Sequence, residues 1–73
     1  MNASKFQGQA IALYPSGREK QVHVMNNPKP DTVVTNFGHF EFKDGEFRWC
    51  WDHSVILKTQ EEMLEKLKKE LGL

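Results

Sequence analysis

The chain has 73 residues, ten basic and ten acidic side chains, and one cysteine. This length allows a single domain and excludes a dinucleotide-binding fold or a large cleft between two lobes. The lone cysteine excludes an internal disulfide. We therefore treat residues 1–73 as one small domain, and a domain of this size buries only roughly 60% of its unfolded surface.

Charge and hydropathy disfavour nucleic acid and membranes as partners. The net charge is zero, although residues 1–30 carry four basic side chains against one acidic, and residues 31–73 carry six against nine. Sequence-independent binding to DNA or RNA normally needs a basic surface. The first ten residues lack the apolar core of a signal peptide, and no run of about 20 apolar residues is present. We expect a cytoplasmic protein with no membrane partner.

The N-terminal part of the chain predicts a loose lead-in, a hairpin and a linker. Residues 1–8 are mostly polar and contain one phenylalanine, which is typical of a lead-in. Residues 9–25 hold two strand-like segments around Pro15-Ser16-Gly17, whose residue types favour a turn. Residues 26–32 contain two prolines and predict a linker inside the domain.

Apolar side chains suggest a register for this first hairpin. Ile11 and Leu13 share one face of the first strand, and Val22 and Val24 share one face of the second. Pairing Leu13 with Val22 and Ile11 with Val24 brings the four side chains together, whereas a slip of one residue would scatter them.

A second hairpin over residues 33–52 is the clearest prediction. Asp44-Gly45 is a strong signal for a two-residue type I′ turn. This loop sets the pairs Lys43–Glu46, Phe42–Phe47, Glu41–Arg48, Phe40–Trp49, His39–Cys50 and Gly38–Trp51. The alternation then gathers the large rings on one face, namely Phe40, Phe42, Phe47, Trp49 and Trp51.

The C-terminal part predicts an amphipathic helix over residues 59–71. Thr59 and Glu62 form the pattern of a capping box, and Gly72 favours a helix end. An apolar stripe follows at helical spacing, made of Met63, Leu64, Leu67 and Leu71. Residues 55–57 are a candidate for a short additional strand before the helix.

These elements predict an α+β fold (ββββα), in which two antiparallel hairpins form one four-stranded or five-stranded sheet and the helix packs on one face. The alternative is a small, strongly bent barrel, SH3-like or OB-like, that carries the helix as an appendage. A helix of about 20 Å covers about half of a sheet roughly 19 Å wide. The aromatic face therefore exceeds what the helix can cover, unless loops and sheet curvature bury the remainder.

We interpret the surplus of aromatic side chains as a binding surface. The predicted function is a small non-enzymatic protein–protein interaction module, an adaptor, inhibitor or regulator, whose partner is an unidentified protein or a second copy of the chain. The predicted contact residues include types favoured at interfaces: Trp49, Trp51, Phe40, Phe47 and Arg48.

Two alternatives remain open. A nucleic-acid-binding module would combine aromatic stacking with basic side chains, here Arg18, Lys20, Lys29 and Lys43. A metal or thiol site would use Cys50, His39 and His53, since Cys50 and His53 have C-x-x-H spacing. Residues three apart on an unbroken strand point to opposite faces, and the sequence supplies no second ligand pair. We expect no cofactor, no metal and no catalytic residue.

Overall fold

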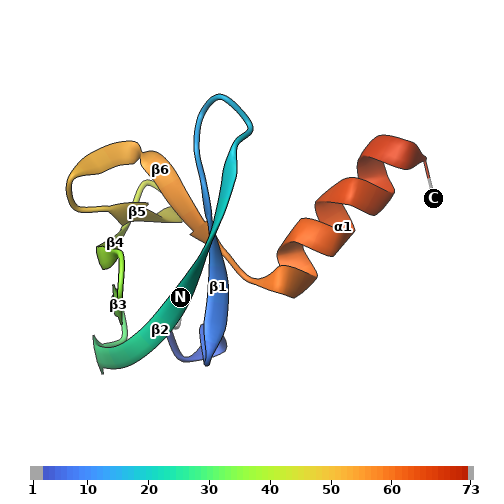
Figure 1. Cartoon of the computed structure of the whole chain (residues 1–73). Coiled ribbons are helices and arrows are strands. Elements are labelled where there is room, and N and C mark those ends of the chain that lie inside the picture. The colour runs from blue at the N-terminus through green and yellow to red at the C-terminus, as the bar shows by residue number, and fades with distance from the viewer. Residues whose placement is uncertain (1–2, 73) are drawn as a thin grey trace.

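The computed structural model describes residues 3–72 as a closed antiparallel β-barrel followed by one helix (Figure 1). The strands follow one another around the barrel in chain order, and β1 closes it by pairing with β6 as well as with β2. The elements are η1 (Ala3–Lys5), β1 (Gln9–Leu13), β2 (Glu19–Lys29), β3 (Thr32–Thr35), β4 (Gly38–Lys43), β5 (Glu46–Trp49), β6 (Asp52–Lys58) and α1 (Gln60–Leu71).

The predicted open sheet with a helix packed on one face is wrong. A turn at residues 36–37, inside the range predicted as one hairpin, separates β3 from β4. The candidate strand over residues 55–57 is part of the longer β6, which pairs with both β5 and β1. Closure gives every strand two neighbours and leaves no unpaired sheet edge. The arrangement agrees with the barrel alternative, in which the helix is an appendage.

The predicted register of the β4–β5 hairpin is confirmed for the four pairs nearest the turn, whereas β5 ends at Trp49 and the ladder does not include the predicted pairs His39–Cys50 and Gly38–Trp51. Phe42 pairs with Phe47 and Phe40 pairs with Trp49. The loop residues Asp44 and Gly45 have positive φ angles of 52° and 84°, as a type I′ turn requires. Local turn chemistry and side-chain alternation therefore determine this part of the barrel.

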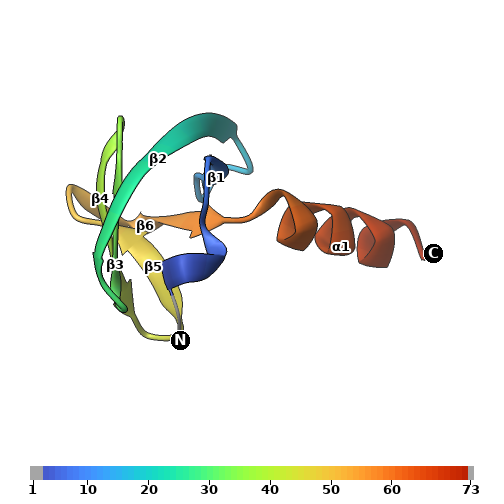
Figure 2. The same cartoon turned by 90° about the horizontal axis from the view of Figure 1, so that it is seen from below.

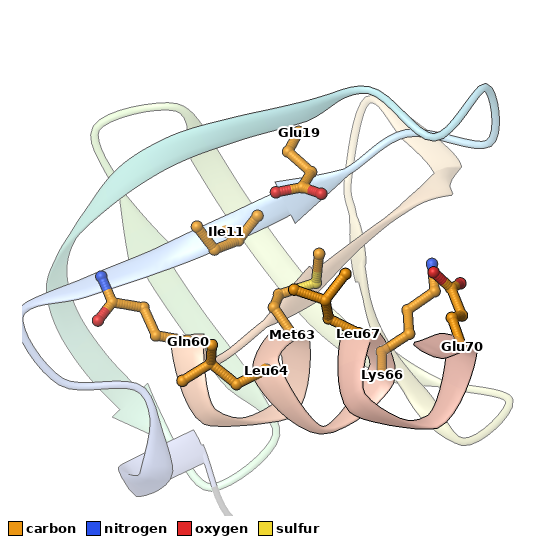
Figure 3. A pocket seen from close by; sticks show the side chains of 8 residues that line it. All are labelled: Ile11, Glu19, Gln60, Met63, Leu64, Lys66, Leu67 and Glu70. Atoms are coloured by element: carbon orange, nitrogen blue, oxygen red, sulfur yellow. The ribbon is translucent and has the colours of Figure 1, made fainter. Parts of the chain in front are cut away.

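The predicted register of the β1–β2 hairpin is wrong. Val22 pairs with Ala10, and Leu13 pairs with Glu19. Ala10 and Ala12 are buried in the core, whereas Ile11 lies on the outer side of β1 toward the helix (Figure 3). Aromatic rings occupy the narrow interior, so small side chains are accommodated there and the bulkier isoleucine faces outward.

Three buried phenylalanines, Phe6, Phe40 and Phe47, fill the interior of the barrel, and the partly buried Phe42 packs against them. Phe6 and Phe47 meet edge to face with ring centroids 5.2 Å apart, and Phe42 meets Phe47 in the same way at 5.1 Å. Phe40 is completely buried among them in the same cluster. Phe6 belongs to the predicted lead-in, which therefore supplies Ala3 and Phe6 to the core, while residues 1–2 lie outside the described residues.

The predicted linker over residues 26–32 is mostly strand. β2 continues to Lys29, with register irregularities on either side of Asn26 that allow a strand to contain Pro28. Asn27 uses its side-chain amide to hold the N-terminal segment, donating to the carbonyls of Ala3 and Phe6 at 3.1 and 3.2 Å.

Helix α1 begins and ends as predicted but does not pack as predicted. Thr59 and Glu62 form the reciprocal capping box, and Gly72 takes the left-handed conformation. None of the residues of α1 is buried, and the helix projects away from the barrel in two perpendicular views (Figures 1 and 2). This projection matches overall dimensions of 37 × 22 × 22 Å. No helix within residues 3–72 has the length and apolar character needed to cross a membrane.

Candidate functional site

One end of the barrel carries a cluster of partly exposed aromatic side chains. Because the strands alternate in direction, the β1–β2, β3–β4 and β5–β6 connections all lie at this end. Each connection, or the strand before it, supplies part of the cluster. We call this cluster the aromatic end; it consists of Tyr14, Phe37, Trp49 and Trp51.

A stacked pair of rings forms the rigid part of the aromatic end. Phe37 and Trp49 lie nearly parallel, with centroids 4.3 Å apart and planes inclined by 12°. The Trp49 indole N–H also donates to the Phe37 carbonyl at 3.0 Å, and the Phe37 N–H donates to the Thr35 hydroxyl at 3.0 Å. Tyr14 approaches Phe37 edge-on at 6.4 Å. Stacking and hydrogen bonds thus fix the same two rings.

Trp51 is the exposed part of the aromatic end, with 76% of its surface accessible. Its indole lies beside that of Trp49, and both approach Gly38. A Cβ atom at Gly38 would lie 2.8 Å from Nε1 of Trp49 and 3.3 Å from Nε1 of Trp51. Gly38 also has a φ of +124°, which side-chain-bearing residues rarely adopt. The glycine therefore makes room for two neighbouring indoles on one side of the hairpin.

Charged groups surround the rings. The ammonium of Lys20 lies 4.5 Å from the centroid of Phe37, a cation–π contact. Asp52, next to Trp51, accepts hydrogen bonds from the Ser54 hydroxyl at 2.6 Å and from the Ser54 N–H at 3.0 Å. These bonds lower the pKa of the Asp52 carboxyl, so it carries its negative charge at neutral pH. The aromatic end thus has a cation on one side and a fixed carboxylate on another.

The structure separates the five predicted contact residues into three groups. Trp49 and Trp51 belong to the aromatic end, whereas Phe40 and Phe47 lie inside the barrel as core residues. Arg48 is half-buried, and its side chain binds backbone carbonyl groups. Its guanidinium donates to three carbonyl oxygens, those of Lys43 at 2.8 Å, His53 at 3.0 Å and Asp44 at 3.3 Å. Of the five predicted contact residues, only Trp49 and Trp51 therefore lie at the aromatic end.

Sequence reasoning missed two members of the aromatic end. It gives Phe37 no role, although Asn36-Phe37-Gly38 has the composition of a turn and would place a ring at a strand end. It gives Tyr14 no role either. Neither contact can be inferred from the sequence unless the strands are known to close into a barrel, since Tyr14 and Phe37 are far apart in the chain.

The residues of the two alternative sites do not gather in one place. Arg18 and Lys20 lie at or beside the aromatic end, but Lys29 and Lys43 close β2 and β4 at the opposite end. Within residues 3–72, no three or more His, Cys, Asp or Glu side chains are grouped so as to hold a metal ion. Cys50 is an exposed free thiol, and its N–H donates to the carbonyl of His39 at 2.9 Å.

Comparisons with protein families, curated proteins and solved structures find no match for this chain. No activity can therefore be transferred to it from a relative. We base the functional proposal on the aromatic end, which combines exposed aromatic rings with nearby charged side chains.

Proposed function

We propose that this chain is a small non-enzymatic interaction module that binds a protein partner at the aromatic end of its barrel. The observation that carries the proposal is the exposed indole of Trp51 beside the rigid Phe37–Trp49 stack. Tryptophan is among the residues that contribute most to binding energy at protein interfaces. Trp51 is not part of the hydrophobic core, so the fold does not depend on its indole.

The geometry favours a particular kind of partner segment. Trp51 offers an apolar ring face of the size that an aliphatic or proline side chain can cover. Lys20 lies over Phe37 and takes part in none of the ion pairs of residues 3–72. An acidic group of the partner could therefore bind it. We infer that the partner presents an apolar side chain with a carboxylate nearby.

We also propose the cytoplasm as the compartment of this module. Cys50 is exposed and unpaired, and accessible free thiols persist in reducing compartments. This proposal rests on the thiol and is independent of the partner.

Peptide display tests the binding function even though the natural partner is unidentified. The full chain, Trp51→Ala and Met25→Ala serve as three baits for a library of extended peptides. Met25 is the control because it is also a large exposed apolar residue. We expect the wild-type chain and Met25→Ala to enrich the same peptides, rich in aliphatic and acidic residues. Trp51→Ala should lose this enrichment without unfolding, since its side chain lies outside the core.

The indole N–H signals of Trp49 and Trp51 provide the decisive readout by NMR. A selected peptide should shift both signals and broaden them at intermediate occupancy, because the two nitrogens flank the same glycine. Peptides that bind equally well to Trp51→Ala, or that leave both indole signals unchanged, would contradict the proposal.

Nucleic-acid binding is the second candidate, and the position of Lys20 over Phe37 favours it. Single-strand binders combine stacking rings with nearby cations. The opposing observation is that the four basic residues predicted for this function are divided between the two ends of the barrel. Titration with a mixed-sequence oligonucleotide at low and moderate salt separates the candidates. Salt-sensitive binding that both Trp51→Ala and Lys20→Ala abolish would replace the protein partner by a nucleic acid.

A further inference from the structure

Helix α1 carries an apolar stripe that the barrel leaves uncovered. Leu64, Leu67 and Leu71 are 57%, 51% and 64% exposed. Between the helix and β1 lies an open groove of about 400 Å³, with Ile11 on the strand side and Met63 and Leu67 on the helix side (Figure 3). Leu64 and Leu67 line the groove and also belong to the stripe, so the two adjoin along the helix.

The spacing of the stripe is that of a helix–helix seam. Gln60, Leu64, Leu67 and Leu71 follow one another at intervals of four, three and four residues, which is the a/d pattern of paired helices. Two charged residues of opposite sign, Glu61 and Lys68, lie on the same flank of this seam, one near each end of the helix. Helix–helix pairing of this kind uses flanking charges to set the orientation.

The charge pattern selects an antiparallel pair of identical helices. In an antiparallel arrangement equal flanks meet, so Glu61 of each copy faces Lys68 of the other and two attractive pairs form. In a parallel arrangement Lys68 would face Met63 of the other copy, and Glu61 would face no residue of the helix. The antiparallel arrangement also sets the helix dipoles in opposite directions and places the acidic first turn beside the basic last turn.

We propose that α1 pairs antiparallel with α1 of a second copy, so that each stripe covers the other and reaches the groove beside Ile11. This surface is distinct from the aromatic end. Because β6 runs from the aromatic end to the opposite end before α1 begins, pairing leaves both aromatic ends free. The dimer is therefore a bivalent module, and linked sites of this kind bind a repeated or multimeric partner more tightly than one site does.

Two helices of this length bury less surface than a standard interface, so the dimer is weak and reversible. Weak complexes have dissociation constants between about 10 µM and 1 mM. Sedimentation velocity of the full chain over this range of concentrations should show a rising dimer fraction. Leu67→Lys should remain monomeric with an unchanged near-ultraviolet circular dichroism spectrum, since Leu67 is not in the core. Met25→Lys, which changes an exposed apolar residue on β2, should dimerise like the wild-type chain.

Charge exchange tests the orientation. Glu61→Lys and Lys68→Glu should each weaken the dimer about tenfold, because two attractive pairs become two repulsive ones. The double variant should restore it, and an equimolar mixture of the two single variants should form heterodimers. Trp51→Ala should dimerise normally, which separates this result from the proposed function.

Three outcomes would overturn the proposal. The wild-type chain could stay monomeric at about 1 mM, the upper end of the range expected for this weak dimer. The single charge variants could dimerise as well as the wild-type chain. Vesicles of mixed zwitterionic and anionic lipid could bind the helix while no dimer forms, which would assign the stripe to a membrane surface.

Discussion

The barrel and the helix use the same kinds of apolar residue in opposite ways. Leu57 on β6 is 1% exposed and belongs to the core, whereas Leu67 on α1 is half exposed although it lies only ten residues further along the chain. Closure of the barrel creates an interior that Phe6, Phe40 and Phe47 fill. The helix starts only after β6 has closed the barrel, and no face of the barrel covers its stripe. Apolar residues in this small chain thus divide into those that fill the core and those that stay exposed, which we propose are used for binding.

The contacts that attach the helix to the barrel are also separate from the hydrophobic core. Thr59 caps the helix, and Glu62 contacts the ammonium groups of Lys5 at 3.3 Å and Lys58 at 3.8 Å. These contacts are polar, partly exposed and confined to the first turn. A helix of 12 residues is marginal in water on its own, so its later turns depend on whatever covers the stripe.

The largest expected effect comes from shortening a core leucine. Leu57→Ala should lower the free energy of unfolding by about 2–5 kcal/mol, because it leaves a cavity among packed rings. Leu67→Ala, measured at a concentration where the chain is monomeric, should change it by less than about 0.5 kcal/mol. Urea unfolding followed by tryptophan fluorescence compares the two. Equal losses of unfolding free energy in the two variants would mean that the stripe is part of the folded core. The distinction between core leucines and exposed leucines would then fail.

Gly38→Ala should have the next largest effect. The new Cβ would lie 2.8 Å from Nε1 of Trp49, and the φ of +124° adds backbone strain. Gly17→Ala is the matched control, since Gly17 has a φ of +91° but open space around it. We expect Gly38→Ala to cost about 1–3 kcal/mol, more than the control, and to alter the near-ultraviolet circular dichroism of the indoles. Equal costs and unchanged indole signals would show that Gly38 does not position the two rings.

The smallest effect concerns the pH dependence of the helix attachment. Burial raises the pKa of Glu62, but the hydrogen bond from the Thr59 N–H and the charges of Lys5 and Lys58 outweigh it, so the pKa is lowered. The resulting stabilisation is fully present above the pKa of an unfolded glutamate and is lost as the pH falls through the lowered pKa. Screening by solvent limits it to about 0.5 kcal/mol.

NMR titration of the Glu62 carboxyl checks this prediction. In Lys5→Ala the pKa of Glu62 should rise toward its ordinary value, and helicity should begin to fall at a higher pH than in the wild-type chain. The same titration midpoint in both proteins would mean that Lys5 does not hold the first turn of the helix.

Short-range signals predicted the parts of the fold that depend on neighbouring residues. Asp44-Gly45 determined the β4–β5 register, and Thr59 with Glu62 marked the start of the helix. In β1 the local pattern is ambiguous, because both faces are apolar: Ala10 lies on one and Ile11 on the other. Assigning the bulkier face to the core is correct for an open sheet and wrong for a narrow barrel.

Closure itself depends on contacts between distant segments and could not be derived from local pattern. The pairing of Ala12 with Leu57 joins strands from opposite ends of the sequence. The same limit applies to the candidate site. The sequence indicated the neighbouring indoles of Trp49 and Trp51, but only the closed barrel brings Tyr14 and Phe37 to them.

The most direct test of this account is to shorten the chain so that it ends at Thr59. We expect the remaining barrel to unfold cooperatively and the indole N–H signals of Trp49 and Trp51 to keep their positions, because no core residue lies in α1. An unfolded chain, or indole signals that collapse to random-coil positions, would show that the helix is part of the fold and would contradict the division between folding and binding surfaces.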